Sequence, residues 1–435
     1  MKSKEAYPVE NRVQALMRFL DHSPSVYHAV ENVRIELEHA GYTRLSEGEE
    51  WELVAGGKYY LTRGGSAVLA FRVPQETPRG FMMSASHSDR PTFKVKENGE
   101  MAGNYTRLAV ERYGGMLMST WLDRPLSIAG RAMVETEQGV QMKLVNIDRD
   151  LLMIPNVAIH MNRQANDGYK WNPAVDMLPL LGGKEAKGKL EGLLEQEAGG
   201  KILGHDLYLY VRQKASVWGV EEEYISSAAL DDLECAWGCT QGFLKAGESK
   251  SIPVLCVFDS EEVGSNSVQG AASMLLPDVL ERICHALGLN MKQMLAQSFM
   301  VSADNAHAVH PNHPEYADAG NAPVMGGGVV LKFNASQRYT TDGLSAAIFR
   351  KVCAEAGVNV QSYCNRADIA GGSTLGHISL THVSVPTADI GLPQLAMHSC
   401  YETAAVADAL ALEDAMAAFY SKSLAVSAAG EYTLA

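Results

Sequence analysis

Histidine and carboxylate side chains, which supply nitrogen and oxygen ligands to divalent metals, recur in short clusters along this sequence. In the first cluster, His87-Ser88-Asp89, two polar side chains two residues apart share one face of an extended chain. A metal-bound histidine is usually oriented by a nearby carboxylate, and Asp89 has the spacing for that task. Because His-x-Asp also arises by chance, the pair becomes informative only if further ligands lie close to it.

Acidic pairs are the next candidates. Glu261 and Glu262 are adjacent in the segment Asp-Ser-Glu-Glu-Val-Gly-Ser, and Asp231 and Asp232 follow Leu230. Of two adjacent glutamates, one can bind a metal while the other transfers protons as a general base. The alternative for the glutamate pair is a solvated turn without a chemical role.

Two single residues complete the set. Asp304 follows an apolar segment and is either a ligand or the N-cap of a helix that begins at Asn305. His398, in Gln-Leu-Ala-Met-His-Ser, is either a ligand or a histidine satisfied in the core.

The elements that must position these residues follow from short apolar runs. Strands that run into or toward candidate residues are predicted at 81–86, 252–258, 299–302 and 382–385, with another at 329–333. Helices are predicted between them at 271–287, 343–356 and 401–424. Such alternation predicts an α/β fold with a mostly parallel mixed sheet flanked by helices. Sites in such sheets form beyond the carboxyl ends of the strands, where these residues fall.

The remaining segments divide the chain into two parts. Residues 9–41 predict two amphipathic helices broken near Ser23-Pro24, and residues 58–62 and 67–73 predict a hairpin. Residues 93–227 favour strands, at 116–121, 132–135, 141–145 and 206–211, with a charged loop or helix at 182–201. We therefore expect a catalytic α/β domain of residues 1–92 and 228–435, interrupted by a β-rich inserted oligomerisation or lid domain at 93–227.

The composition is that of a globular chain of two domains: 435 residues, 46% hydrophobic and 20% charged. No apolar run reaches the roughly 18 residues of a spanning helix, and the N-terminus has no apolar segment typical of a secretory signal. Seven scattered cysteines without a C-x-x-C pair predict free thiols in the cytoplasm, with Cys256 and Cys284 as small core residues. A net charge of −14 disfavours nucleic acid and anionic membranes as partners.

Taken together, these motifs resemble the aspartyl aminopeptidase family, in order and over nearly the whole chain. The segments that carry the resemblance are SASHSDR (84–90), WLDRPLSIAGR (121–131), IPNVAIHMNR (154–163), ISSAALDDL (225–233), DSEEVGSNSVQGA (259–271), SADNAHAVHPN (302–312), KFNASQRYT (332–340) and DIGLPQLAMHSCYE (389–402). The resemblance implies a zinc-peptidase-like fold and a metallo-aminopeptidase that releases the N-terminal residue, Asp or Glu by preference, from short unblocked peptides. It also implies a large closed homo-oligomer, a dodecamer in the family.

The resemblance implies a role for each candidate residue. Two divalent metals would be held by His87 and His398, one on each, with Asp231 bridging and Glu262 and Asp304 completing the set. Glu261 would be the general base, Asp89 would orient His87, and His160 would be presented by a neighbouring subunit to stabilise the oxyanion. Lys332, Tyr339 and His310 would contact the substrate.

Charge balance agrees with this set. Three carboxylates and two neutral imidazoles leave one positive charge on two divalent ions, which a bridging hydroxide, the nucleophile, would neutralise. Nitrogen and oxygen ligands without thiolate favour zinc, with manganese or cobalt as alternatives.

Two departures from the family pattern, the segment 90–93 (RPTF) and Asp232 where asparagine is common, are expected not to touch the ligands. Lys332 is the expected reader of an acidic side chain, although a lone lysine on a strand is otherwise solvated. The competing functions are a peptidase for neutral residues, a deacylase, and a catalytically silent scaffold.

Overall fold

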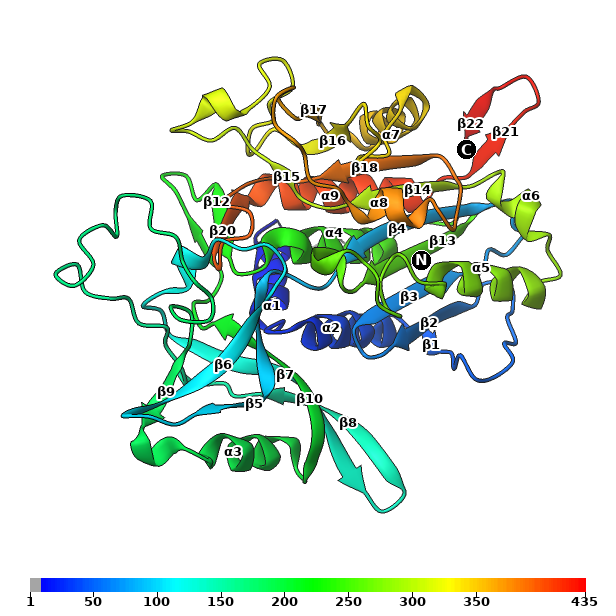
Figure 1. Ribbon diagram of the computed structural model, residues 1–435. Coiled ribbons are helices and arrows are strands. Elements are labelled where there is room, and N and C mark those ends of the chain that lie inside the picture. Colours follow the sequence, from blue (N-terminus) through cyan, green and yellow to red (C-terminus); the bar gives the residue numbers. More distant parts are fainter. Residues whose placement is uncertain (1–8) are drawn as a thin grey trace.

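The computed structural model describes residues 9–435, and its centre is a nine-stranded mixed sheet (Figure 1). The strand order is β1-β2-β3-β13-β4-β14-β18-β16-β17. Their bounds are β1 Thr43–Arg44, β2 Lys58–Arg63, β3 Ala67–Arg72, β4 Phe81–His87, β13 Ile252–Phe258, β14 Phe299–Ala303, β16 Val329–Phe333, β17 Val360–Cys364 and β18 Thr387–Gly391.

Four central strands run in the same direction. β4 is parallel to β13 and to β14, and β14 is parallel to β18. Every residue of β4 and β13 is buried, as expected for strands covered on both faces. Their carboxyl ends therefore meet at one edge of the sheet, and Phe258 lies directly opposite His87.

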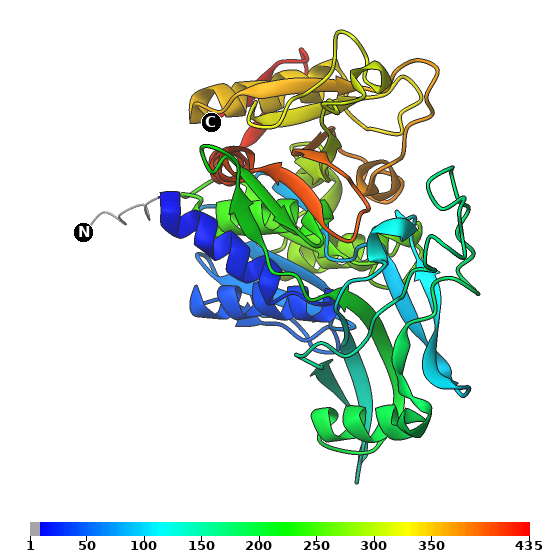
Figure 2. The ribbon, with the colours of Figure 1, turned by 90° about the vertical axis from the view of Figure 1, so that its left-hand side faces the viewer.

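Helices cover both faces of this sheet, as Figure 2 shows. One face packs against α1 Val9–Asp21, α2 Val26–His39, α4 Leu230–Lys245, α7 Gly343–Ala356 and α9 Val406–Tyr420. The other face packs against α5 Leu275–Ala286, α6 Met291–Leu295 and α8 Leu375–Ser379. The two apolar layers make the core of the α/β part.

A six-stranded antiparallel sheet, formed within residues 92–211, projects from this core (Figures 1 and 2). Its order is β8-β7-β10-β5-β6-β9, with β5 Thr92–Met101, β6 Tyr105–Tyr113, β7 Leu126–Thr136, β8 Gly139–Asn146, β9 Leu180–Gly183 and β10 Ile202–Val211. Helix α3, Lys189–Ala198, contributes Leu190, Leu194 and Ala198 to its separate core. The chain enters this sheet shortly after His87 and leaves it at Val211, twenty residues before Asp231.

A smaller five-stranded sheet links the two parts, and a hairpin lies near the end of the chain. The small sheet has the order β11-β12-β20-β19-β15, with β11 Ser216–Trp218, β12 Tyr224–Ser227, β15 Ala306–His307, β19 Pro393–Leu395 and β20 Glu402–Ala405. The hairpin pairs β21 Leu424–Val426 with β22 Tyr432–Leu434. Short 3-10 turns are η1 Met118–Trp121, η2 Lys184–Ala186, η3 Glu261–Val263 and η4 Pro314–Tyr316.

The predicted α/β class, the helix-flanked mixed sheet and the β-rich segment are confirmed, and α1 and α2 flank the predicted break. Two element predictions and one alternative are wrong. Residues 382–385 form a turn, and the strand is β18, which begins after Pro386. Residues 118–121 form η1 instead of a strand, after a turn at Gly114, which has a positive φ. Asp304 does not begin a helix but precedes β15.

Two smaller predictions are imprecise. Helix α9 is shorter than the predicted 401–424, because β20 occupies residues 402–405. The predicted loop or helix at 182–201 contains helix α3 and also the end of strand β9. Across residues 9–435, no helix is long and apolar enough to cross a membrane. Residues 1–8, which belong to the segment expected to lack a secretory signal, lie outside the described residues. All seven cysteines are free, and Cys256 and Cys284 are buried as predicted.

Candidate metal centre

The carboxyl edge of the central sheet collects every predicted metal ligand. His87 ends β4, Glu262 lies in η3 after β13, and Asp304 follows β14. Asp231 is the second residue of α4, and His398 lies between β19 and β20. Three overlapping groups form here, each with one ligand atom per residue and all of these atoms within 4.8 Å of one another: His87, Asp231, Asp232 and Asp304; His87, Glu261 and Glu262; and Asp231, Glu262 and His398.

Asp231 lies at the middle of the cluster. His87 Nε2 is 3.6 Å from Asp231 Oδ1, and His398 Nε2 is 3.5 Å from Asp231 Oδ2. His398 Nε2 is also 3.5 Å from Glu262 Oε1. One oxygen of Asp231 therefore faces each imidazole, which is the arrangement required of a carboxylate that bridges two metal ions.

The cluster has buried acceptors that no donor satisfies. Within residues 12–435, Asp231 Oδ1, Asp232 Oδ1 and Glu262 Oε1 are buried without a hydrogen-bond partner. Burial raises the pKa of Asp304 to about 6 and that of Glu261 to about 8. Uncompensated buried carboxylates are costly, and divalent cations would remove that cost. The donor set thus fits two divalent metals, and its nitrogen and oxygen atoms fit zinc as well as manganese or cobalt.

Asp89 connects His87 to the glutamate pair. Asp89 Oδ1 lies 3.3 Å from His87 Nδ1 and accepts a hydrogen bond from the Glu261 backbone N–H at 3.1 Å. Asp89 Oδ2 accepts from the Glu262 N–H at 3.1 Å and from the Tyr113 hydroxyl at 2.8 Å. The contact to His87 agrees with the expected orienting role, and the bonds to η3 extend it, because Asp89 also fixes the loop that carries Glu261.

Tyr113 ends β6, so the antiparallel sheet reaches the metal centre, and sequence reasoning missed this contact. The next residues continue it. Gly114 has φ +76°, which favours glycine, and a Cβ there would crowd Glu262 Cβ at 3.1 Å. The Leu117 N–H donates to the His398 carbonyl at 3.0 Å. The only sequence signal for this contact is the glycine pair that turns the chain.

Glu402 is a second residue that the sequence did not identify. Its Oε2 accepts from the Asp231 N–H at 3.0 Å, and its Oε1 accepts from the His398 N–H at 2.7 Å. Burial raises the pKa of this carboxyl to about 8. Glu402 therefore links the backbones of two predicted ligands, Asp231 and His398.

The expectation that Asp232 lies away from the ligands is wrong. The His87 backbone N–H donates to Asp232 Oδ2 at 3.0 Å, and Asp232 belongs to one of the three ligand groups. The other departure agrees with the expectation at Arg90, which donates to the carbonyls of Ser23 and Pro24 at the turn between α1 and α2.

A cavity of about 190 Å³ opens beside the metal centre. Its wall includes Asp231, Glu261, Asp304, His307, Lys332, Tyr339, Tyr363 and His398. Lys332 is only 2% exposed, so the alternative of a solvated lysine is wrong. Its ammonium donates to the Asp304 carbonyl at 2.7 Å and lies 5.2 Å from the centre of the Tyr339 ring.

Two predicted residues lie elsewhere on this subunit. His310 is exposed, accepts from the Asn312 N–H at 3.2 Å, and is absent from the cavity wall, where His307 stands instead. His160 is exposed in the loop 155–176 and also does not line the cavity.

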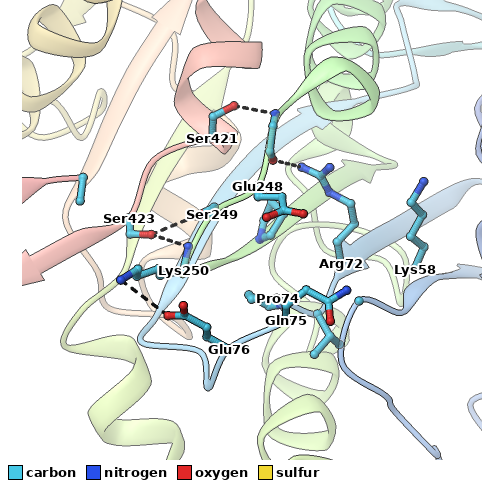
Figure 3. Close-up of a pocket in the computed structure, with 15 residues that line it drawn as sticks. Lys58, Arg72, Pro74, Gln75, Glu76, Glu248, Ser249, Lys250, Ser421 and Ser423 are labelled. Atoms are coloured by element: carbon cyan, nitrogen blue, oxygen red, sulfur yellow. Dashed lines mark hydrogen bonds and ion pairs between the residues drawn. The ribbon is translucent and has the colours of Figure 1, made fainter. Parts of the chain in front are cut away.

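A larger pocket of about 430 Å³ lies at the opposite end of β13 (Figure 3). It contains three cationic side chains, but they hold the protein's own groups. Arg72 donates to the Ala246 and Gly247 carbonyls, Lys250 pairs with Glu76 at 3.6 Å, and Lys58 donates to the Ala40 carbonyl. The catalytic candidates therefore lie at the other end of the sheet.

Comparison with known proteins agrees with this geometry. Residues 19–420 match the family described as aminopeptidase I zinc metalloprotease (M18). A probable M18 family aminopeptidase 2 from Clostridium acetobutylicum is 42% identical over 422 residues, covering 93% of this chain and 98% of the relative. A chain of the cryo-electron microscopy structure of the Ape4 and Nbr1 complex superposes with a TM-score of 0.92 at 34% identity, covering 97% of this chain and 87% of the other. The S. cerevisiae mApe1 dodecamer gives a TM-score of 0.84 at 25% identity, covering 94% and 96%. The chain belongs to the M18 family of zinc metallo-aminopeptidases.

Proposed function

We propose that this aminopeptidase removes N-terminal Asp or Glu from peptides with a free α-amine. The observation that supports this preference is the buried ammonium of Lys332 in the wall of the cavity beside the metal centre. An ammonium has three donors, and the carbonyls of Asp304 and Asn305 occupy two of them at 2.7 and 3.4 Å. The third donor is available for a substrate carboxylate, and Tyr339 and Tyr363 shape the space around it.

The ligands in this proposal are His87, Asp231, Glu262, Asp304 and His398, with zinc the favoured ion. When bound, two such ions supply Lewis acidity toward the scissile carbonyl and lower the pKa of water. Glu261 takes the proton of the attacking water and delivers it to the leaving amine. Asp89 supports both steps, because it orients His87 and holds the backbone N–H of Glu261.

The proposal includes a homo-oligomer in which His160 of one subunit faces the metal centre of its neighbour. The loop 155–176 that carries His160 presents apolar side chains to the exterior, with Met161 83% and Val175 65% exposed. Such side chains are typical of surfaces that become buried on association. The S. cerevisiae relative is a dodecamer, and we propose the same assembly here, with 93–227 as the oligomerisation or lid domain of a cytoplasmic enzyme.

One observation favours a second function, a peptidase for neutral N-terminal residues or a deacylase. Asp304 Oδ1 lies 3.9 Å from the Lys332 ammonium, so part of that positive charge is already neutralised. If this pairing dominates, Lys332 neutralises the charge of Asp304 and does not bind the side chain of the substrate.

Substitution of Lys332 by methionine separates these functions. Wild type and Lys332→Met are assayed on dipeptides that differ only in the N-terminal residue, with zinc, manganese and cobalt in turn. Loss of one hydrogen bond between charged groups, about 1.5–3 kcal/mol, lowers kcat/KM for Asp and Glu roughly 10- to 150-fold and leaves Ala and Leu within a few-fold. Lys250→Met, at the distant pocket, is the matched control, and zinc content is measured for each protein. Cleavage of Ala and Leu by the wild type at least as fast as of Asp and Glu, with no change in Lys332→Met at full zinc content, would favour the second function.

A further inference from the structure

Asp232 is a buried acid of the metal centre that the expected ligand set does not include. Its side chain is 0% exposed, and it follows the central ligand Asp231 in the sequence. We propose that the Asp232 carboxylate is a further member of the metal centre, supplying a negatively charged oxygen to the ion held between His87 and Asp304. This inference rests on the proposed ligand set, and its test does not depend on peptidase activity.

The two oxygens of Asp232 differ in their surroundings. Oδ2 accepts the backbone N–H of His87 at 3.0 Å, which fixes the direction of the side chain. Oδ1 is buried and has no hydrogen-bond partner of ordinary geometry among the described residues; the nearby donor is the Cys235 thiol. A thiol is a weak donor, so an Asp that served only to hold His87 would leave one buried carboxylate oxygen poorly compensated.

The position of Asp232 selects one end of the centre. One of its ligand atoms lies within 4.8 Å of ligand atoms on His87, Asp231 and Asp304. The groups that contain Glu262 do not include Asp232. The added charge therefore acts on the ion at the His87–Asp304 end, and the ion at the His398–Glu262 end keeps its own ligands.

An asparagine at this position would preserve the shape and remove the charge. Its amide oxygen can still accept the His87 N–H, whereas its NH₂ group is a donor and would repel a cation. With Asp232 ionised, four carboxylates (Asp231, Asp232, Glu262 and Asp304) face two divalent ions. Replacement of Asp232 by Asn should therefore lower the metal affinity of one site and leave the other site unchanged.

The test measures zinc binding to the metal-free protein. Wild type and Asp232→Asn are titrated with zinc against a chromophoric chelator, which resolves the dissociation constants of the two sites. We expect one constant to rise about 10- to 100-fold, the usual effect of losing a group that supports a metal site, and the other to stay within a few-fold. Glu234→Gln is the matched control, because Glu234 is equally buried in the same helix α4 and belongs to none of the ligand groups.

A second measurement uses cobalt. Cobalt at the affected site should show an altered visible absorption spectrum in Asp232→Asn, and the same site should be lost in Asp304→Asn. If Asp232→Asn does not fold, as judged by circular dichroism, Asp232→Ser keeps an acceptor for His87 and takes its place. Unchanged zinc constants and cobalt spectra, or an equal loss in Glu234→Gln, would overturn the inference. Failure of the proposed function looks different: wild type would bind zinc and release no amino acid.

Discussion

Tyr113→Phe tests whether the antiparallel sheet helps to hold the catalytic loop. The substitution removes the 2.8 Å hydrogen bond from the Tyr113 hydroxyl to Asp89 Oδ2 and retains the ring. A hydrogen bond to a charged group contributes about 1.5–3 kcal/mol, equivalent to roughly 10- to 150-fold in a rate if it is fully expressed in the transition state. Asp89 keeps the backbone N–H groups of Glu261 and Glu262. We therefore expect the lower end, about a tenfold decrease in kcat.

The assay compares kcat, KM and zinc content on the best dipeptide substrate. KM should change little, because Tyr113 does not line the cavity beside the metal centre. Tyr208→Phe is the matched control, since its ring packs edge-on against Tyr113 at 5.6 Å and no hydrogen bond to Asp89 is present within the described part of the chain. If kcat of Tyr113→Phe stays within twofold of this control at full zinc content, the hydroxyl does not support catalysis and the reasoning is refuted.

Three further outcomes are expected. Glu261→Gln should keep two zinc ions per subunit, as counted by atomic absorption, and lose about 10²–10⁴-fold in kcat, whereas substantial residual turnover would exclude Glu261 as the base. His160→Ala should keep its zinc and lose about 10²–10³-fold as one oxyanion donor disappears; mixed oligomers of His160→Ala and Glu261→Gln subunits should regain activity, and no regain would contradict a role in trans. Burial raises the pKa values of Glu261 and Glu402 to about 8, so the metal-free folded protein keeps protons that the unfolded chain loses near pH 4.3. The stability that these groups contribute is therefore full below about pH 4.3 and is lost as pH rises through about 8. The melting temperature of chelator-treated protein should therefore fall between pH 6 and pH 9, more steeply than with zinc, and parallel curves would show that these groups do not titrate.

The sequence predicted most of the elements that carry the metal centre because their apolar runs are short and uninterrupted. β13 and β16 have the predicted bounds, and β4 and β14 differ by one residue at one end. β18 was misplaced because it contains Asp389, a buried acid that a hydropathy pattern assigns to solvent. Thr340 and Thr374 satisfy Asp389 by hydrogen bonds from segments remote in the sequence, and such long-range compensation leaves no local signal.

The same limit applies to the site. The five proposed ligands and the proposed base Glu261 could be predicted because each lies near a recognisable strand end or motif. Tyr113, Asp232 and Glu402 act through contacts that only the folded chain creates. The bond between His87 and Asp232 joins residues 145 positions apart, and the bond between Asp231 and Glu402 joins residues 171 positions apart. Residue types alone do not reveal such pairs, although Asp232 stood next to a predicted ligand.

The path of the chain into and out of the antiparallel sheet has a mechanical consequence. The first crossing lies just after the proposed ligand His87, and the second runs through β11 and β12 before it reaches the proposed ligand Asp231. Bound metal would therefore hold together the two segments that connect the α/β part to the antiparallel sheet, residues 89–92 and 212–230. Force applied to the projecting sheet would be transmitted to His87 and Asp231. Removal of metal should make these connecting segments more mobile. Limited proteolysis of chelator-treated protein should therefore cut near residues 89–92 and 212–230 before it cuts the core of the α/β part or of the antiparallel sheet.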